Sequence, residues 1–279
     1  MIDAHTHIFF PEVRKNRSNY MFGEEAFKLI YANEKARMAS AEELVEAMDK
    51  DGVDRSITFG FPWRTLYTVT RANDYVLEAM QTYPDRIIGF ACAYPEGKGL
   101  QKELDRCLSA GMRGVGELAF YTGRLSAEDM LETMKPVLEV CKNHQAPLML
   151  HANENVGHTY PGKSEVCLGE LYRFLKAIAP QPVILAHWGG GLFFYELMKK
   201  EVAESLAHVV YDTAASPFLY RTRIYSLASE ICGEKRIVLG SDFPLIPVSR
   251  YFAEMEEAGL SADTRNRICG ENLKELLGL

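Results

Sequence analysis

The segment Ile2-Asp3-Ala4-His5-Thr6-His7 provides the first predicted strand and the first candidate metal ligands, and the rest of the sequence is interpreted from it. Side chains at positions i and i+2 of an extended strand point to the same face, so His5 and His7 are expected side by side at the end of a short strand. Two neutral imidazoles held in this way form half of a metal site. The pattern also fits two polar residues that end a surface strand, and later residues decide between these interpretations.

The composition is that of an ordinary globular protein, with 47% hydrophobic and 25% charged residues among 279. The net charge of -7 and the lack of a Lys/Arg run argue against nucleic acid or a membrane surface as a partner. The six cysteines form no C-x-x-C pair, which is typical of reduced thiols in a cytoplasmic protein. Because residues with a chemical role are expected from residue 3 onward, we expect no signal peptide before the fold.

Short apolar runs recur along the chain at intervals that predict eight buried strands. The seven that follow the first are Val53–Gly60, Arg86–Ala93, Gly114–Ala119, Pro147–His151, Pro182–His187, Ala207–Asp212 and Arg236–Asp242. Each is rich in Val, Ile, Leu or Ala, as strands covered on both faces are. Eight such strands with helical patterns between them predict a parallel (β/α)8 TIM-like barrel, a single domain over residues 1–279.

Amphipathic patterns predict the helices between these strands. They are Ala41–Asp51, Asp74–Tyr83, Leu100–Ala110, Ser126–His144, Ser164–Ala179, Leu192–Ser205, Pro217–Cys232, Val248–Ala258 and Ser261–Leu277. Ser40 is expected to cap the first of them. The connection from Phe9 to Ser40 is unusually long and contains a predicted helix over Glu24–Arg37. Connections of this length are usually lids or binding elements.

Polar residues gather at the carboxyl ends of the predicted strands, where barrels of this type carry their active sites. They are His5, His7, Glu117, His151, His187 and Asp242. Taken singly, each has a structural explanation: a histidine hydrogen-bonded in the core, a glutamate paired with an arginine, an aspartate that caps the next helix. Together, the imidazoles and carboxylates predict a divalent metal site, with zinc first and manganese, iron or nickel as alternatives.

Several stretches resemble the amidohydrolase superfamily, and within it the amidohydrolase-related group that contains aminocarboxymuconate-semialdehyde decarboxylase. The resemblance rests on His5-x-His7, on His151, on Ile184-Leu-Ala-His187-Trp-Gly-Gly and on Leu239-Gly-Ser-Asp242-Phe-Pro. It implies a (β/α)8 barrel with one or two metal ions in its mouth. By position, His5, His7, His151 and Asp242 correspond to metal ligands, and His187 to the acid/base or to a ligand of a second metal.

The glutamate in Gly114-Val-Gly-Glu117 resembles the fourth-strand glutamate of TatD-type DNases, which contacts the metals. Many decarboxylases of the group lack it, so Glu117 favours hydrolysis and is expected beside the metal. A metal-activated water attacks in such chemistry, with Asp242 accepting its proton and His187 polarising the substrate.

Residues after other strands are candidates for substrate contact, although aromatic residues there are as often part of the packing. They are Trp63, Arg64, Asn153, His158, Tyr160 and Trp188. Arg64, with Arg14 or Arg17 from the long connection, could grip a substrate carboxylate, and surface solvation is the alternative.

The leading prediction is a metal-dependent hydrolase of a small organic amide, ester or lactone, with Asp242 and His187 as catalytic residues. A metal-dependent decarboxylase of an aromatic or unsaturated carboxylic acid is the alternative. A TatD-like nuclease and a non-catalytic metal-binding barrel rank below these. We expect one tightly held metal ion, a cytoplasmic location and a small-molecule substrate; whether the chain forms a homo-oligomer stays open.

Overall fold

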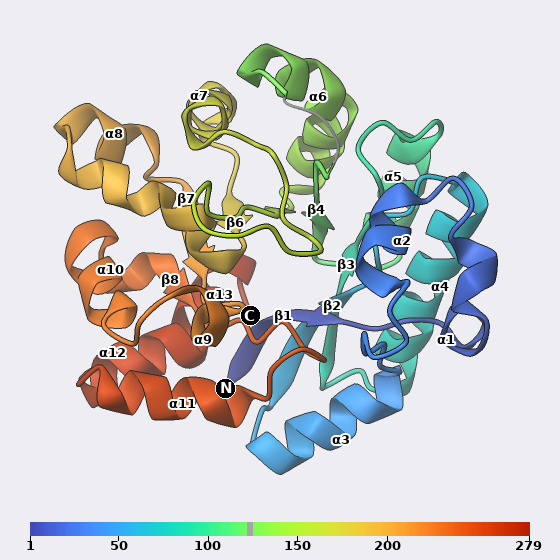
Figure 1. Ribbon diagram of the computed structural model, residues 1–279, viewed down its shortest axis with the longest axis horizontal. Coiled ribbons are helices and arrows are strands. Elements are labelled where there is room, and N and C mark those ends of the chain that lie inside the picture. Colours follow the sequence, from blue (N-terminus) through green and yellow to red (C-terminus); the bar gives the residue numbers. More distant parts are fainter. Residues whose placement is uncertain (122–124) are drawn as a thin grey trace.

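The structure, a computed structural model, describes residues 1–121 and 125–279 and places eight parallel strands in one sheet (Figure 1). The strands are β1 (Ile2–His7), β2 (Arg55–Phe59), β3 (Ile87–Ala91), β4 (Gly114–Leu118), β5 (Leu148–Leu150), β6 (Val183–Leu185), β7 (Val209–Asp212) and β8 (Ile237–Val238). Each pairs with the next strand along the chain. All eight lie within the ranges predicted from the sequence.

Backbone hydrogen bonds between β1 and the segment after β8 bring the two ends of the sheet together. The N–H of Ala4 donates to Leu239 O at 2.7 Å, and the N–H of His7 donates to Phe243 O at 2.8 Å. In the opposite direction the N–H of Asp242 donates to His5 O at 3.0 Å. The predicted single-domain (β/α)8 barrel is confirmed.

Helices surround the strands (Figure 1). The α-helices are α1 (Pro11–Lys15), α2 (Glu25–Tyr31), α3 (Ala41–Asp51), α4 (Leu66–Thr82), α5 (Leu100–Ser109), α6 (Ala127–His144), α7 (Leu168–Ile178), α8 (Lys200–Ser205), α9 (Ser216–Leu219), α10 (Ile224–Cys232), α11 (Val248–Glu257), α12 (Ala262–Asn266) and α13 (Asn272–Leu277). The 3-10 helices are η1 (Arg17–Tyr20), η2 (His187–Leu197) and η3 (Glu234–Arg236), and η4 (Arg267–Glu271) is π-helical. Among the described residues, no helix has the length and apolar character needed to cross a membrane.

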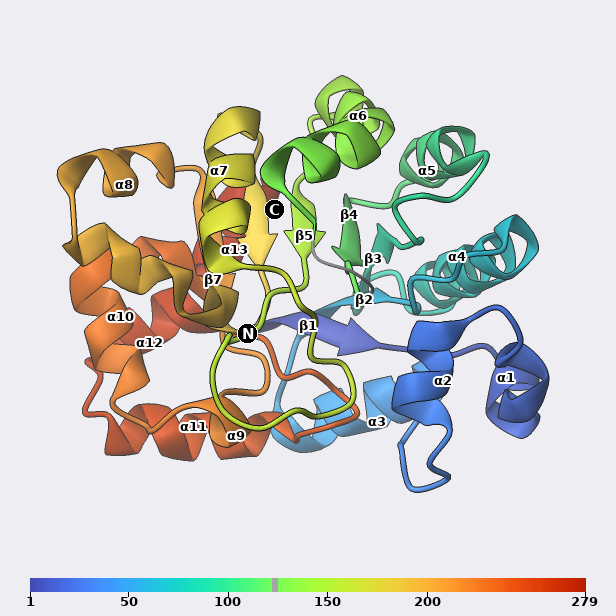
Figure 2. The same ribbon diagram turned by 45° about the horizontal axis from the view of Figure 1, so that its top comes forward.

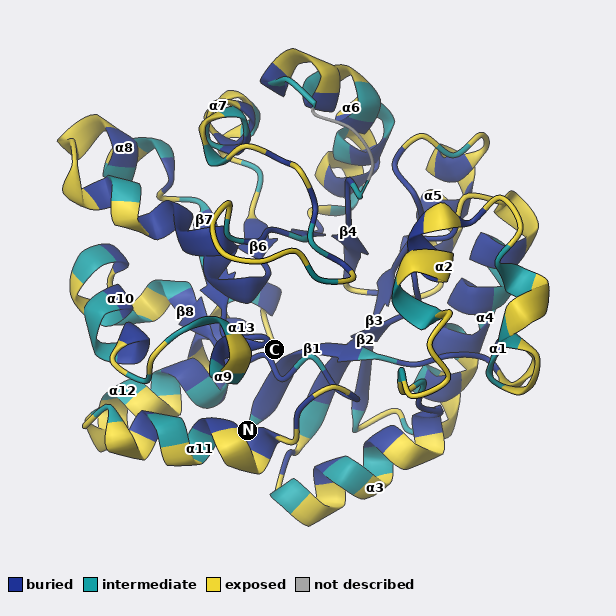
Figure 3. Ribbon diagram, in the orientation of Figure 1, coloured by how far each residue is buried: buried dark blue, intermediate teal, exposed yellow. Residues whose placement is uncertain are grey.

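Local sequence signals account for where several helices begin. Ser40 caps α3 as predicted, since its hydroxyl accepts from the Glu43 N–H while the Glu43 carboxylate accepts from the Ser40 N–H. Ser126 and Asp129 form the same reciprocal pair at the start of α6. Helices outside the barrel bury their inner faces and expose their outer ones, while the strands are almost entirely buried (Figure 3). The hydrophobic core therefore lies inside the barrel and between its wall and the helices.

The structure corrects four of the predicted helices. The range predicted over Leu192–Ser205 is divided between η2 and α8, because Lys199 between them is extended, with φ -151° and ψ 139°. The range over Pro217–Cys232 is divided into α9 and α10 at Tyr220, which is also extended. The π-helical turn η4 interrupts the closing helix. The helix predicted over Glu24–Arg37 ends at Tyr31, and the chain from there to α3 is irregular.

Candidate metal centre

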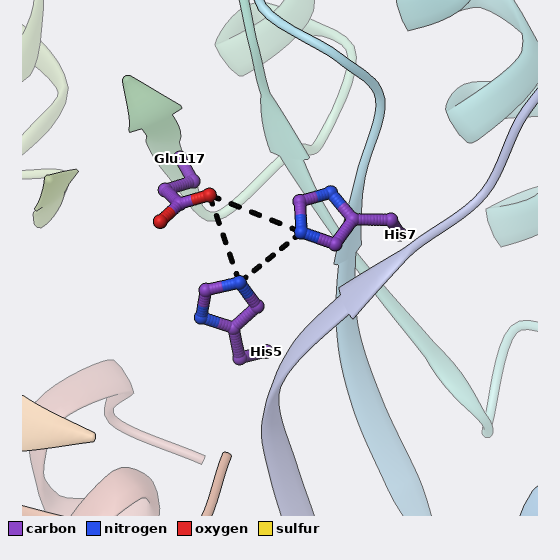
Figure 4. A group of neighbouring side chains, drawn as sticks. All are labelled: His5, His7 and Glu117. Carbon is purple, nitrogen blue, oxygen red and sulfur yellow. Dashed lines mark hydrogen bonds and ion pairs between the residues drawn. The ribbon is translucent and has the colours of Figure 1, made fainter. Parts of the chain in front are cut away.

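Polar side chains at the carboxyl ends of the strands meet inside the mouth of the barrel. The six residues predicted there are His5 and His7 on β1, Glu117 on β4, and His151, His187 and Asp242 just beyond β5, β6 and β8. The side chains of His5, His7 and Glu117 point toward one another (Figure 4). The strand alternation that predicted a shared face for His5 and His7 therefore describes their actual arrangement.

Four donor atoms converge from three strand ends. His5 Nε2 lies 3.2 Å from His7 Nε2. Glu117 Oε2 lies 3.6 Å from His5 Nε2 and 3.9 Å from His7 Nε2, and Asp242 Oδ1 lies 3.6 Å and 3.4 Å from the same two nitrogens. Ligands about 2.0–2.2 Å from a tetrahedral ion lie about 3.3–3.6 Å from one another. The spacing of these atoms therefore suits a divalent cation.

Asp212, at the end of β7, fixes the orientation of His5 and was missed among the site residues predicted from the sequence. Its Oδ2 accepts from His5 Nδ1 at 2.8 Å, which leaves the lone pair of His5 Nε2 directed at the converging donors. Its Oδ1 accepts from the backbone N–H groups of His187 at 2.8 Å and Ala214 at 2.9 Å. A carboxylate behind a ligating histidine fixes its tautomer and increases its basicity. The signal was available, since Asp212 ends a predicted strand as Asp242 does.

The other oxygen of Glu117 faces the two remaining histidines. Its Oε1 accepts from His151 Nδ1 at 2.9 Å and lies 3.4 Å from His187 Nε2. His187 Nδ1 donates to Ala214 O at 3.1 Å, so its Nε2 is the atom that faces the site. Among the four converging donors, Glu117 takes the place that the family resemblance implied for His151. His151 instead pairs with His187 on the far side of the carboxylate.

Two buried ring nitrogens of this cluster, His7 Nδ1 and His151 Nε2, have no hydrogen-bond partner within the described part of the chain. A buried polar atom without a partner costs free energy unless a ligand or water satisfies it. With its Nδ1 donating to Glu117, His151 keeps a lone pair on Nε2, as a metal ligand would. The donor set and the unpaired nitrogen fit a divalent cation bound at this cluster.

The charges of the cluster are strongly coupled. Burial lowers the pKa of His5, but Glu117, Asp212 and Asp242 more than offset this effect, and the pKa rises to about 10. For His187 the hydrogen bond and charge of Glu117 outweigh burial in the same way, and the pKa rises to about 9. Burial raises the pKa of Asp242, yet the neighbouring histidines lower it to about 2. The carboxylates thus favour positive charge in the mouth of the barrel, whether it comes from protons or from a metal ion.

A cavity of about 870 Å³ opens above these side chains. His7, Glu117, His151, His187 and Asp242 form its floor. Its wall consists of four segments: residues 30–37 before α3, residues 154–162 after β5, residues 215–219 around α9, and residues 244–245 after β8, with Phe61, Pro62 and Tyr121 completing it. His158 and Tyr160, two of the predicted substrate contacts, lie in this wall.

Two predicted contacts, Trp63 and Trp188, belong to the core instead. Trp63 is 1% exposed and packs its ring 4.4 Å, centre to centre, from that of Phe27. Trp188 is fully buried and donates from Nε1 to Ser216 Oγ at 3.0 Å. Its ring packs against that of Tyr225, with 5.3 Å between the ring centres. Neither ring is among the described residues that line the cavity.

Two polar candidates also lie outside the cavity lining. Asn153 is buried at the base of the loop after β5. Its Oδ1 accepts two hydrogen bonds from Ser164, one from the backbone N–H at 2.7 Å and one from the hydroxyl at 2.8 Å. The Arg64 guanidinium lies 4.0 Å from the centre of the Tyr94 ring, and its backbone N–H donates to the Glu24 carboxylate. Asn153 therefore shapes the loop, and Arg64 fixes the chain before α4.

The arginines of the long connection have structural roles as well. Arg17 donates to the carbonyl oxygens of Tyr31, Asn33 and Ala36, at 3.3, 3.0 and 3.1 Å. Arg14 donates to Met38 O at 3.1 Å and pairs with the Glu43 carboxylate. These contacts favour a structural role for Arg14 and Arg17 over a grip on a substrate carboxylate, and neither is among the described residues that line the cavity. The cations that do line the cavity are Lys35 and Arg37.

Known proteins share both the sequence pattern and the fold. The family model described as Amidohydrolase (Amidohydro_2) matches residues 2–279. No curated protein sequence matches the chain significantly. The solved structure of 5-carboxyvanillate decarboxylase from Sphingomonas paucimobilis is 16% identical, with a TM-score of 0.76, over 100% of this chain and 99% of that one.

Two further solved structures show the range of activities on this fold. A dihydroxybenzoic acid decarboxylase from Polaromonas sp. JS666, with bound manganese, is 18% identical with a TM-score of 0.72, over 100% of this chain and 96% of that one. A putative 2-pyrone-4,6-dicarboxylic acid hydrolase from Pseudomonas putida is 17% identical with a TM-score of 0.67, over 99% and 97%. At these identities the likeness shows the fold alone. Because the family model spans almost the whole sequence, the chain belongs to the amidohydrolase family, as the sequence resemblance predicted.

Proposed function

We propose that this protein is a metal-dependent decarboxylase of an aromatic or unsaturated carboxylic acid. The observation that carries the proposal is the set of four converging donors below a cavity whose wall includes the aromatic rings of Tyr31, Phe61 and Tyr121. Such walls suit a flat conjugated substrate. The decarboxylases among the structural neighbours support this activity over the hydrolysis that the sequence favoured.

His5, His7, Asp242 and Glu117 would hold the metal ion. When bound there, a divalent cation supplies positive charge that neutralises a substrate carboxylate and polarises adjacent oxygen atoms. The mixed nitrogen and oxygen donors accept either zinc or manganese. Asp212 keeps the His5 ring in the orientation this binding needs.

His187 is placed to supply the proton that decarboxylation requires. When the bond between the ring carbon and the carboxylate breaks, carbon dioxide leaves and the electron pair remains on carbon. Protonated His187 can deliver a proton from Nε2 to that carbon, because Nδ1 is held by Ala214 O and Nε2 faces the floor. The hydrogen bond and charge of Glu117 favour the protonated form of this ring and raise the pKa of His187 to about 9.

Hydrolysis of an amide, ester or lactone is the second candidate, and Glu117 is the observation that favours it. The two Glu117 oxygens face the His5/His7 pair and the His151/His187 pair, an arrangement in which one carboxylate can contact two cations. Two-metal sites of this kind serve hydrolytic reactions.

The test is turnover by protein loaded with manganese or with zinc. A panel of hydroxybenzoates and unsaturated acids is followed by carbon dioxide release and product mass, and a parallel panel of amides, esters and lactones by hydrolysis products. Decarboxylation that disappears in the metal-free protein and in His5→Ala is expected. Hydrolysis without carbon dioxide release would replace the proposal by the second candidate, and no turnover on either panel with the metal bound would favour a binding role.

A further inference from the structure

The segment that follows α2 brings two positive charges to the mouth of the cavity. Lys35 and Arg37 both line it and are exposed, at the outer end of the wall. Across the opening lies the loop after β5, which contributes residues 154–162 (Figure 2). The cavity therefore has two cationic side chains, here called the rim, in a wall that also contains the aromatic rings of Tyr31, Phe61 and Tyr121.

The backbone that carries these two side chains is held in place. The Arg17 guanidinium donates to three carbonyl groups of this segment, including that of Ala36 between the two cations. Asn33 closes the turn, since its Oδ1 accepts from the Lys35 N–H at 3.0 Å and its carbonyl accepts from the Ala36 N–H at 2.9 Å. A rim fixed before a ligand arrives loses little entropy on binding.

Neither side chain has a partner in the part of the chain that the structure describes. Within the described residues, the Lys35 ammonium and the Arg37 guanidinium form no hydrogen bond or ion pair, whereas Arg14 pairs with Glu43. The carboxylate in the opposite wall, Glu154, already binds Lys163 at 3.0 Å and the Tyr160 hydroxyl at 2.9 Å. The rim is thus locally positive in a protein of net charge -7. Such a local field attracts anions to the mouth of a cavity.

The cavity is large enough that a substrate can contact this rim and the floor, where the reaction takes place, with different parts of the molecule. Its volume of about 870 Å³ lies in the upper part of the range of about 300–1,000 Å³ that holds drug-sized ligands. A single ring with one carboxylate at the floor would leave much of it unfilled. A longer molecule could reach the floor with one end and the rim with the other.

We infer that Lys35 and Arg37 bind an anionic group at the outer end of the substrate, so that the substrate is an acid with two separated negative charges. The inference rests on the proposed function, which places one carboxylate at the floor. The second anion meets the Arg37 guanidinium, which can donate two parallel hydrogen bonds to a carboxylate, and the Lys35 ammonium beside it. These two residues select the substrate and take no part in the bond changes at the floor.

Calorimetric binding to manganese-loaded protein tests the inference. The probes are two matched pairs, terephthalate with benzoate and biphenyl dicarboxylate with biphenyl monocarboxylate. At least one diacid is expected to bind roughly three- to tenfold more tightly than its monoacid, the size expected of one or two exposed ion pairs. Higher salt should reduce this preference. Equal binding of diacid and monoacid in both pairs would overturn the inference.

Variants show whether the preference comes from the rim. Lys35→Ala/Arg37→Ala should lose it while monoacid binding stays unchanged, and Lys35→Arg/Arg37→Lys should retain most of it. Lys28→Ala is the matched control, an exposed cation on α2 that does not line the cavity. A preference that survives the double alanine variant would also overturn the inference. A preserved preference without decarboxylation of any acid would count against the proposed function alone.

Discussion

The strand-end ring and the loop wall of the cavity are held in place in different ways. The strand-end ring consists of His5, His7, Glu117, His151, His187 and Asp242. The loop wall consists of the segments 30–37, 154–162, 215–219 and 244–245. The ring is buried or partly buried, with His5 fully covered and Glu117 4% exposed, while the wall includes Phe218, which is 61% exposed.

Contacts in the ring connect strands that are distant in the sequence. Asp212 on β7 holds both the ring of His5 on β1 and the backbone of His187 after β6. Contacts in the wall are made largely by loop residues, as where Lys163 donates to Glu154 Oε1 and His158 O, or where Arg17 donates to Ala36 O. The strands of the barrel therefore position the ring, and the loops and their neighbours position the wall. We expect changes in the ring to alter metal binding and chemistry, and changes in the wall to alter substrate affinity.

The largest effect is expected from removing a ring donor. His5→Ala and Asp242→Ala each leave only three of the four converging donors, and we expect metal content close to zero after dialysis. Mass-spectrometric metal analysis per chain measures it. Glu117→Gln should weaken binding less than either, because the amide keeps one oxygen donor. If His5→Ala keeps one full equivalent of metal per chain, the converging donors are not the main metal site.

The next effect separates binding from chemistry within the ring. His187→Asn should keep the metal and lower kcat by about 10²–10⁴-fold, since the variant cannot deliver a proton from an imidazole. Metal analysis and turnover are measured on the same preparation. If the parent protein binds two equivalents of metal per chain and the variant binds one, His187 is a metal ligand and the ring holds two ions.

A smaller effect is expected from Asp212, which holds His5 from β7 and is expected to increase metal affinity. Asp212→Asn removes the charge behind His5 and should weaken metal affinity by about 10–100-fold. Competition with a chelator of known affinity gives the value. Asp105→Asn is the matched control, because Asp105 contacts His144 on the protein surface. An unchanged metal affinity in Asp212→Asn would mean that the charge of Asp212 is not needed to position the ring.

The ring could be predicted from sequence because strand geometry leaves few choices. Alternation puts His5 and His7 on one face, and parallel strands in a barrel bring their carboxyl ends together whatever lies between them. Asp212 obeys the same rule and was overlooked because it was assigned only to the strand. Which donors meet was harder to predict, since Glu117 rather than His151 faces the two β1 histidines.

The wall could not be predicted because the direction of a loop side chain depends on local backbone angles and on distant neighbours. Trp188 follows His187 directly and both have a left-handed φ, yet His187 lines the cavity while the Trp188 ring meets Ser216. Arg17 was a candidate for substrate binding, but its guanidinium meets backbone carbonyls of the same irregular connection. Neither outcome has a periodic signal in the sequence.

A substitution at Trp63 tests whether this residue stabilises the core or contacts the substrate. Trp63→Phe should lower the free energy of unfolding by roughly 1–2 kcal/mol, because it removes part of a fully buried ring, and should leave KM unchanged. Urea unfolding and steady-state kinetics measure the two quantities. A several-fold rise in KM with unchanged stability would return Trp63 to the wall, where the sequence placed it.

The smallest effect is expected from a single hydroxyl in the wall. Tyr160 donates to Glu154 Oε2 at 2.9 Å, and Lys163 holds the other oxygen of the same carboxylate at 3.0 Å. Tyr160→Phe removes one of these two contacts and keeps the ring that lines the cavity. Since Lys163 remains, the loop should stay in place, with a stability loss below about 1.5 kcal/mol.

The consequence for function should be confined to substrate affinity. A slightly looser loop is expected to raise KM by about two- to threefold, less than 1 kcal/mol of binding. Metal content and kcat should not change, because no hydrogen bond or ion pair of the described residues joins this loop to the four converging donors. Kinetics and metal analysis on Tyr160→Phe and Lys163→Met together test this, the second variant removing the stronger contact. A fall in metal content in either would show that the wall supports the ring, and the division between the two regions would fail.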